Sequence, residues 1–122
     1  MPAGRKATPR LYSVTYTIPP DLGTVAVHAF PIFLPGNTII EGDLQVITTL
    51  ASGTSAAEVS VGITGTTTNL LVATVITDLN TDILTGFTPL FIANPTRIVV
   101  EFTVEAITGG SFALNLQTYT FS

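Results

Sequence analysis

The sequence predicts an all-β fold, a β-sandwich of about seven to eight antiparallel strands with jelly-roll or immunoglobulin-like topology. Apolar and polar residues alternate with a period of two along most of the 122 residues. Turn-forming residues recur about every 8–12 positions. No long segment combines a 3.6-residue apolar period with helix caps. These three observations give the fold class, and they leave the choice between the two topologies open.

The first half of the chain contains four predicted strands. LYSVTYTI alternates cleanly, and Pro19 and Pro20 end it. The segment 23–37 is apolar on both faces, which is expected of a strand that is buried on two sides or covered by a neighbour. TIIEGDLQVITTL and the short EVSVGI follow, separated by the loop ASGTSA, and TGTTTN is the next predicted turn. The residues expected to face the core are Tyr12, Val14, Tyr16, Ile18, Ile40, Leu44, Val46, Leu50, Val59, Val61 and Ile63.

The second half begins with a less regular region, residues 69–96, where we expect irregular strands or one short helical turn. RIVVEFTVEAI and SFALNLQTYTF then alternate clearly and are joined by Thr108, Gly109 and Gly110. This pattern is typical of two strands that pair as a hairpin around a TGG turn.

The composition is poor in charge. Charged residues make up 10% of the chain, against roughly 25% in an ordinary globular domain, and the mean hydropathy is +0.56. The simplest interpretation is that an apolar surface is covered by other copies of the chain or by a larger partner. The alternative is a monomer whose surface is polar but uncharged, which the 22 threonines would allow.

Several classes of protein are not expected. No apolar run reaches the roughly 18 residues that a membrane span needs, and we expect no membrane partner. The basic N-terminal residues are not followed by the apolar run of a signal peptide. The chain has no cysteine, so disulfides, cysteine-based zinc sites and thiol catalysis are excluded.

The first ten residues, MPAGRKATPR, contain three of the four basic residues: Arg5, Lys6 and Arg10. We predict an extended basic arm over residues 1–10 and a single sandwich domain over residues 11–122. From residue 11 onward the chain has eight acids and one base, so the arm is complementary to another copy or to an acidic partner, and the three basic residues are the candidate contacts. A disordered solubilising terminus and a nucleic-acid-binding arm are alternatives, although the acidic body makes nucleic acid an unlikely partner.

The residues that could carry catalysis form weak patterns. His28 lies within AVHAFPIF and no GxSxG motif supplies a serine nucleophile, so we expect a buried or interface histidine. Glu41 with Asp43, and Glu101 with Glu105, have the even spacing that places two carboxylates on one face of a strand. A solvated sheet face has the same pattern. We therefore predict no enzymatic activity.

The segment DLNTD has the D-x-N-x-D spacing that begins a calcium loop, formed here by Asp78, Asn80 and Asp82. The motif then fails, because Ile83 takes the glycine position and Pro89 the final glutamate position. We expect a capped turn, with a weak Ca²⁺ site as the alternative, and we predict no cofactor.

Two stretches within residues 57–121 resemble small β-sandwich proteins encoded among the virion structural genes of tailed bacteriophages. The matching elements are a strand with V-x-V-G (Val59, Val61, Gly62), an apolar segment (Leu70 to Thr74), and a hairpin turn (Thr108, Gly109, Gly110). The chain departs from the pattern at TGTTTN, where acidic and glycine residues are common, and its N-terminal half has no distinctive match.

The resemblance implies a non-enzymatic virion protein. The expected role is that of a capsid cement or decoration protein, made in the host cytoplasm and located on the capsid exterior, that binds the major capsid protein or another virion protein and bridges capsomers. We expect a homo-oligomer, with a trimer favoured over a dimer because icosahedral lattices offer threefold positions. A tail, neck or fibre-associated subunit is an alternative. So is a module that binds host glycan or protein through ASGTSA and TGTTTN.

Overall fold

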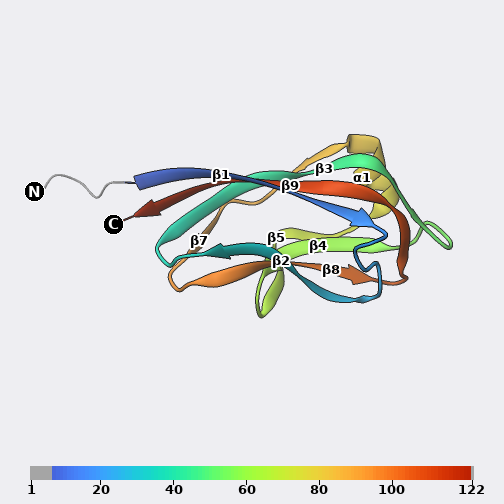
Figure 1. The fold of residues 1–122 in the computed structure, drawn as a ribbon, viewed down its shortest axis with the longest axis horizontal. Helices are drawn as coiled ribbons and strands as arrows, with labels where there is room; N and C mark the ends of the chain where they lie inside the picture. The colour runs from blue at the N-terminus through green and yellow to red at the C-terminus, as the bar shows by residue number, and fades with distance from the viewer. Residues whose placement is uncertain (1–6, 122) are drawn as a thin grey trace, which may run out of the picture.

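The computed structural model describes residues 7–121, which form two antiparallel β-sheets packed face to face, as shown in Figure 1. Sheet A contains β1 (Ala7–Ile18), β3 (Thr38–Ser52), β6 (Leu84–Gly86), β7 (Leu90–Ile92) and β9 (Ile107–Phe121). Sheet B contains β2 (Ala26–Leu34), β4 (Glu58–Ile63), β5 (Thr66–Val75) and β8 (Thr96–Thr103). The structure confirms the predicted all-β sandwich. Its strands number nine because the short β6 and β7 both pair with β3.

The strand order shows that the chain crosses repeatedly between the sheets. The order is β1-β9-β3-β6 in sheet A and β2-β8-β4-β5 in sheet B. Among long consecutive strands, only β4 and β5 pair directly. In the immunoglobulin arrangement the first two strands lie side by side in one sheet, whereas β1 and β2 lie in different sheets here.

The predicted C-terminal hairpin is wrong. β8 lies in sheet B and β9 in sheet A, so the two strands face each other across the core. The chain turns at Val104, where φ is 74° and the N–H of Glu105 donates to the carbonyl of Thr103 in a γ-turn. The TGG segment lies inside β9, and Gly110 passes close to the backbone of Thr49 in β3.

The less regular region, where irregular strands or one short helical turn were expected, contains the end of β5, a seven-residue helix and the short strands β6 and β7. Helix α1 (Ile76–Asp82) follows β5 and leads into β6. Its buried residues, Ile76 and Leu79, pack on the core. In residues 7–121, no helix is long and apolar enough to cross a membrane.

Strand β1 begins earlier than the sequence indicated. Residues 7–10, which we assigned to the arm, pair with the end of β9 between Thr118 and Phe121. Residues 1–6 lie outside the described residues. The division into an arm and one sandwich domain stays a prediction.

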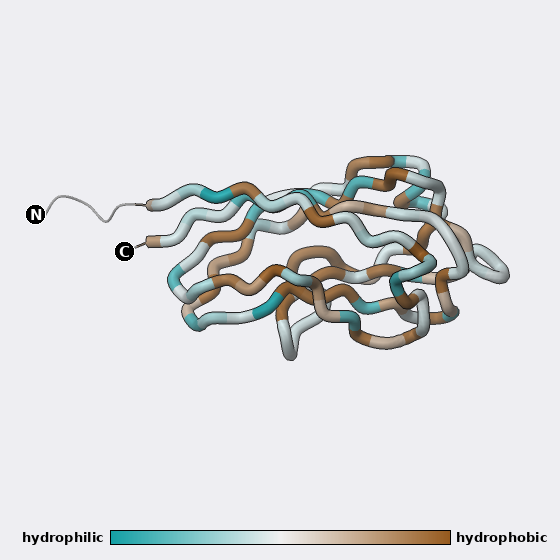
Figure 2. The backbone as a smooth tube through the Cα atoms, in the orientation of Figure 1, coloured by the Kyte–Doolittle hydropathy of each residue, from teal (hydrophilic) through white to brown (hydrophobic). Residues whose placement is uncertain are grey.

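The core lies between the two sheets and is built by the alternating residues that the sequence indicated. Figure 2 shows apolar segments recurring along both sheets with few strongly hydrophilic ones. Phe30, Phe102 and Phe112 are fully buried. The ring of Tyr16 stacks on Phe30 at 5.4 Å and on Phe112 at 5.5 Å. Fully burying one such phenylalanine contributes about 1.5–3 kcal/mol, so these aromatic residues hold the two sheets together.

Candidate assembly surfaces

The connections of the sandwich lie at two ends. The turns 35–37, 64–65 and 93–95 lie where β1 begins and β9 finishes, which we call the terminal end. The loops 19–25 and 53–57, helix α1, and the turn 104–106 lie at the opposite end, which we call the helix end (Figure 1). Each candidate residue can be placed by these two ends.

Arg10 lies on β1 at the terminal end, opposite Thr118. At this end β1 and β9 reach beyond the turns of sheet B (Figure 1). Arg10 is therefore exposed, although it lies on the face of β1 that turns toward the core farther along the strand. It lines a hollow of about 360 Å³, and the lining contains no acidic residue. Arg5 and Lys6, the other predicted contacts, lie outside the described residues. The remaining lining residues of the hollow are Thr8, Tyr12, Phe33, Pro35 and Thr120.

The second cation of the described chain lies at the same end. Arg97 is exposed at the start of β8, and its cross-strand partner is Phe33 of β2. Phe33 is 62% exposed and also lines the hollow beside Arg10. The exposed aromatic ring therefore borders both arginines. Sequence analysis missed Arg97 and Phe33 because only the β2–β8 register brings them together.

Strand β2 has an apolar outer face. It is the edge strand of sheet B and its outer face is exposed, so burial on two sides, one of the two predicted states, is wrong. Cover by a neighbour stays a prediction. Its inward residues Phe30, Ile32 and Leu34 are buried, whereas Val27 is 51% and Phe33 62% exposed on the outer face. Pro31 and a break in the β2–β8 pairing between Ala29 and Phe33 interrupt the ladder. An exposed apolar edge strand of this kind is a surface suited to protein contact.

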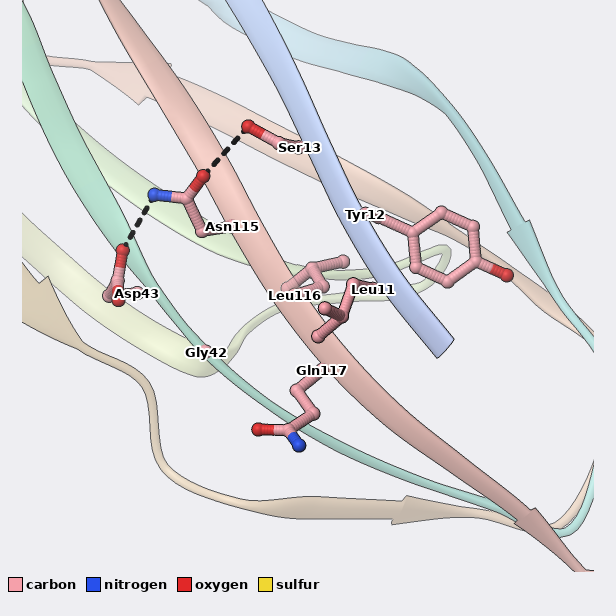
Figure 3. A pocket seen from close by; sticks show the side chains of 8 residues that line it. All are labelled: Leu11, Tyr12, Ser13, Gly42, Asp43, Asn115, Leu116 and Gln117. Atoms are coloured by element: carbon pink, nitrogen blue, oxygen red, sulfur yellow. Dashed lines mark hydrogen bonds between the residues drawn. The ribbon is translucent and has the colours of Figure 1, made fainter. Parts of the chain in front are cut away.

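The outer face of sheet A is polar at its centre. Figure 3 shows Asn115 of β9 between Ser13 of β1 and Asp43 of β3. The Ser13 hydroxyl donates to Asn115 Oδ1 at 2.8 Å, and Asn115 Nδ2 donates to Asp43 Oδ1 at 3.0 Å. These groups border a hollow of about 420 Å³ above Gly42, where a Cβ atom would lie 2.0 Å from the Asn115 carbonyl oxygen. The hydrogen bonds among Ser13, Asn115 and Asp43 join three strands. Leu11, which also borders this hollow, is 80% exposed.

At the helix end, Glu105 organises the loop after β3. Its carboxylate accepts hydrogen bonds from the Ser52 hydroxyl at 2.5 Å, from the N–H and hydroxyl of Thr54 at 2.9 and 2.8 Å, and from the Ala56 N–H at 3.0 Å. These donors, the Ser52 hydroxyl foremost, lower the pKa of Glu105 from 4.5 to about 2. The γ-turn at Val104 aims the carboxylate at this loop, so Glu105 does not share the strand face of Glu101, as the spacing had suggested.

The segment DLNTD, expected as a capped turn with a weak Ca²⁺ site as the alternative, instead forms most of helix α1, so the predicted turn is wrong. Residues two apart on a helix point in different directions, so the three oxygen side chains do not converge as they would in a loop. Asn80 instead joins the helix to β3: its Oδ1 accepts from the Leu50 N–H at 2.8 Å and its Nδ2 donates to the Leu50 carbonyl at 2.9 Å. No group of three or more metal-ligating side chains is assembled within residues 7–121. Asp78 and Asp82 are exposed on the helix.

Of the remaining catalytic candidates, His28, Asp43 and Glu101 have structural partners. His28 is half-buried, 4.9 Å from the ring of Phe102, with Nε2 2.8 Å from the Thr24 carbonyl oxygen. Glu41 and Asp43 share the outer face of β3, as predicted. Glu101 accepts a hydrogen bond from the Thr67 hydroxyl at 2.7 Å.

The two loops proposed as a shared binding module lie far apart. ASGTSA is at the helix end, where Ser52, Thr54 and Ala56 bind Glu105. TGTTTN includes the Thr64–Gly65 turn at the terminal end and the start of β5. The structure does not bring them together into one site.

The fold and these surfaces define a two-sheet β-sandwich with an exposed apolar edge strand and chemically different ends. No family model matches the chain, and no curated protein sequence matches it. Among solved structures, its fold is similar to one chain of the acidic stable capsid structure of Helicobacter pylori bacteriophage KHP30. The TM-score is 0.72 at 16% identity, over 98% of this chain and 92% of that chain. The likeness confirms the expected resemblance to a bacteriophage virion protein at the level of the fold.

Proposed function

We propose that this protein is a non-enzymatic structural subunit of a phage virion, acting as a cement or decoration protein on the capsid exterior. The observation that carries the proposal is the fold shared with a chain of a bacteriophage capsid over nearly the whole length. The strand order supports it. Sheets ordered β1-β9-β3-β6 and β2-β8-β4-β5 correspond to a double-sheet jelly roll, an architecture used by viral capsid domains.

The mechanism would be adhesive. The exposed apolar residues of β2 and of both ends would be buried against neighbouring copies or capsomers, contributing about 25 cal/mol per Å² of apolar area. A homo-oligomer, with a trimer favoured, would bridge capsomers through these faces. Arg10 and the preceding Arg5 and Lys6 would add oriented contacts from the terminal end.

The test is to look for the protein in particles of the phage that encodes it, by mass spectrometry of purified virions and by immunogold labelling with an antibody raised against the recombinant chain. Stoichiometric amounts with label over the head exterior are expected. Label confined to the tail or neck would favour the tail-associated alternative, and absence from virions would overturn a virion role altogether.

The contribution of the arm can be tested separately. A chain starting at Ala7 removes Arg5 and Lys6 and leaves β1 intact, whereas a chain starting at Leu11 also removes residues that pair with β9. The Ala7 version is therefore the informative one. Weaker binding to empty capsids than that of the full chain is expected, and equal binding would remove the arm from the mechanism.

A further inference from the structure

The charges of the described chain are segregated along its long axis. Both described cations, Arg10 and Arg97, lie at the terminal end. Most carboxylates lie at the helix end, in the β1–β2 loop, at the start of β4, on α1 and after β8. These helix-end acids are Asp21, Glu58, Asp78, Asp82 and Glu105.

Among residues 7–121, the lining of the hollow around Arg10 and the cross-strand partner of Arg97, which is Phe33, include no carboxylate. At the helix end, Asp78 and Asp82 are exposed on α1. Each end thus presents charge to the outside.

Both ends also expose large apolar side chains next to these charges. Phe33 is 62% and Phe91 55% exposed at the terminal end. Ile83 is 53% and Val104 64% exposed at the helix end. Apolar side chains combined with arginine and aromatic residues are the composition of an interface core, with the charges giving specificity and orientation.

We propose that the terminal end of one copy, through Arg10, Arg97 and Phe33, binds the helix end of a second copy, through Asp78, Asp82 and the apolar residues around α1. A twofold contact made end to end, with one terminal end against another, would set cation against cation. The charge distribution instead favours a head-to-tail contact between two different patches, which closes into a ring such as a trimer or continues as a filament. This inference deepens the proposed function, because it supplies the contact by which copies would assemble.

The experiment is a reciprocal charge exchange, read by light scattering at low salt on the full chain. Arg10→Glu/Arg97→Glu gives a chain with two acidic ends, and Asp78→Lys/Asp82→Lys a chain with two basic ends. Wild type is expected as a multiple of the 12.8 kDa chain. Each variant alone should associate at least tenfold more weakly, and an equimolar mixture should regain the larger mass because both contacts are restored with their signs exchanged.

Controls separate this contact from general charge effects and from misfolding. Glu41→Lys changes an exposed charge on the outer face of sheet A, on β3 and separated from β1 by β9, outside the proposed contact residues, and should associate as wild type does. Arg10→Gln/Arg97→Gln is a milder variant, and circular dichroism should show every variant folded. A wild-type chain that stays monomeric up to about 1 mM, variants as large as wild type, or a mixture that stays monomeric would each overturn the head-to-tail contact. These results leave the virion test unchanged, since that test depends on the presence of the protein in particles.

Discussion

The two ends of the sandwich differ in how they are closed. At the helix end, side chains bind backbone groups of distant segments: Glu105 holds the 52–56 loop, and Asn80 joins α1 to Leu50. At the terminal end β1 and β9 run past sheet B and leave a hollow lined by Arg10 and Phe33. At the helix end Glu105 and Asn80 bind their own chain, whereas the residues that line the hollow beside Arg10 at the terminal end include no carboxylate.

This difference teaches that charge in this protein serves two purposes. A carboxylate that accepts four hydrogen bonds stabilises a loop of its own chain. An exposed arginine next to an exposed aromatic ring contributes little to the fold and is available to a partner. We therefore expect substitutions of Glu105 and Asn80 to change stability, and substitutions of the exposed charges at either end, Arg10 as well as Asp78 and Asp82, to change association.

The largest expected effect is on the core between the sheets, because its loss destabilises both ends of the sandwich. Phe112→Ala empties a fully buried site in the aromatic core and should lower the free energy of unfolding by about 3–5 kcal/mol, measured by urea denaturation. Phe91→Ala is the matched control, because Phe91 is 55% exposed; it should change stability by less than about 0.5 kcal/mol. Equal losses from the two variants would contradict the assignment of the core.

A smaller effect is expected from the link between α1 and β3. Asn80→Ala leaves the N–H and carbonyl of Leu50 without their side-chain partner and should lower the free energy of unfolding by about 1–3 kcal/mol. Hydrogen exchange should quicken at the helix end and remain unchanged at the terminal end. Thr77→Ala, an exposed position on the same helix, serves as the control.

Glu105 makes the folding stability of the protein depend on pH through the helix end. Its pKa is lowered to about 2 in the folded chain, so its ionised form favours folding at every pH above its ordinary pKa of 4.5. This contribution is lost as the pH falls from about 4.5 through about 2. The stability difference between wild type and Glu105→Gln should therefore be greatest above pH 4.5 and shrink toward pH 2. A difference that stays constant over this range would contradict the role of the ionised carboxylate.

The smallest effect on stability is expected at the terminal end. Arg10→Ala removes an exposed side chain and should change the free energy of unfolding of the monomer by less than about 0.5 kcal/mol. A larger loss would mean that Arg10 supports the sandwich itself, and the contrast between the two ends would then fail.

Much of the sandwich could be predicted from particular strands. The alternation in LYSVTYTI correctly predicted the inward face of β1, including the buried Ile18, and TIIEGDLQVITTL predicted Ile40, Leu44 and Leu50. The C-terminal hairpin was wrong because a period of two is satisfied equally by strands that pair and by strands that face each other across a core. Of the residues in the proposed contact surface, only Arg10 was a candidate from the sequence, and its role stays a prediction. Arg97 and Phe33 are distant in sequence and show no local pattern.

The sequence by itself determined the all-β class, the shortage of charge and the inward face of most strands, because alternation and composition are local properties of the chain. Only the tertiary structure decided that β8 and β9 lie in different sheets, that Glu105 binds a loop about fifty residues away, and that the two arginines share one end. The physical reason is that these features depend on long-range pairing and on the turn at Val104. Local preferences do not specify such contacts, and they form only when the whole core packs.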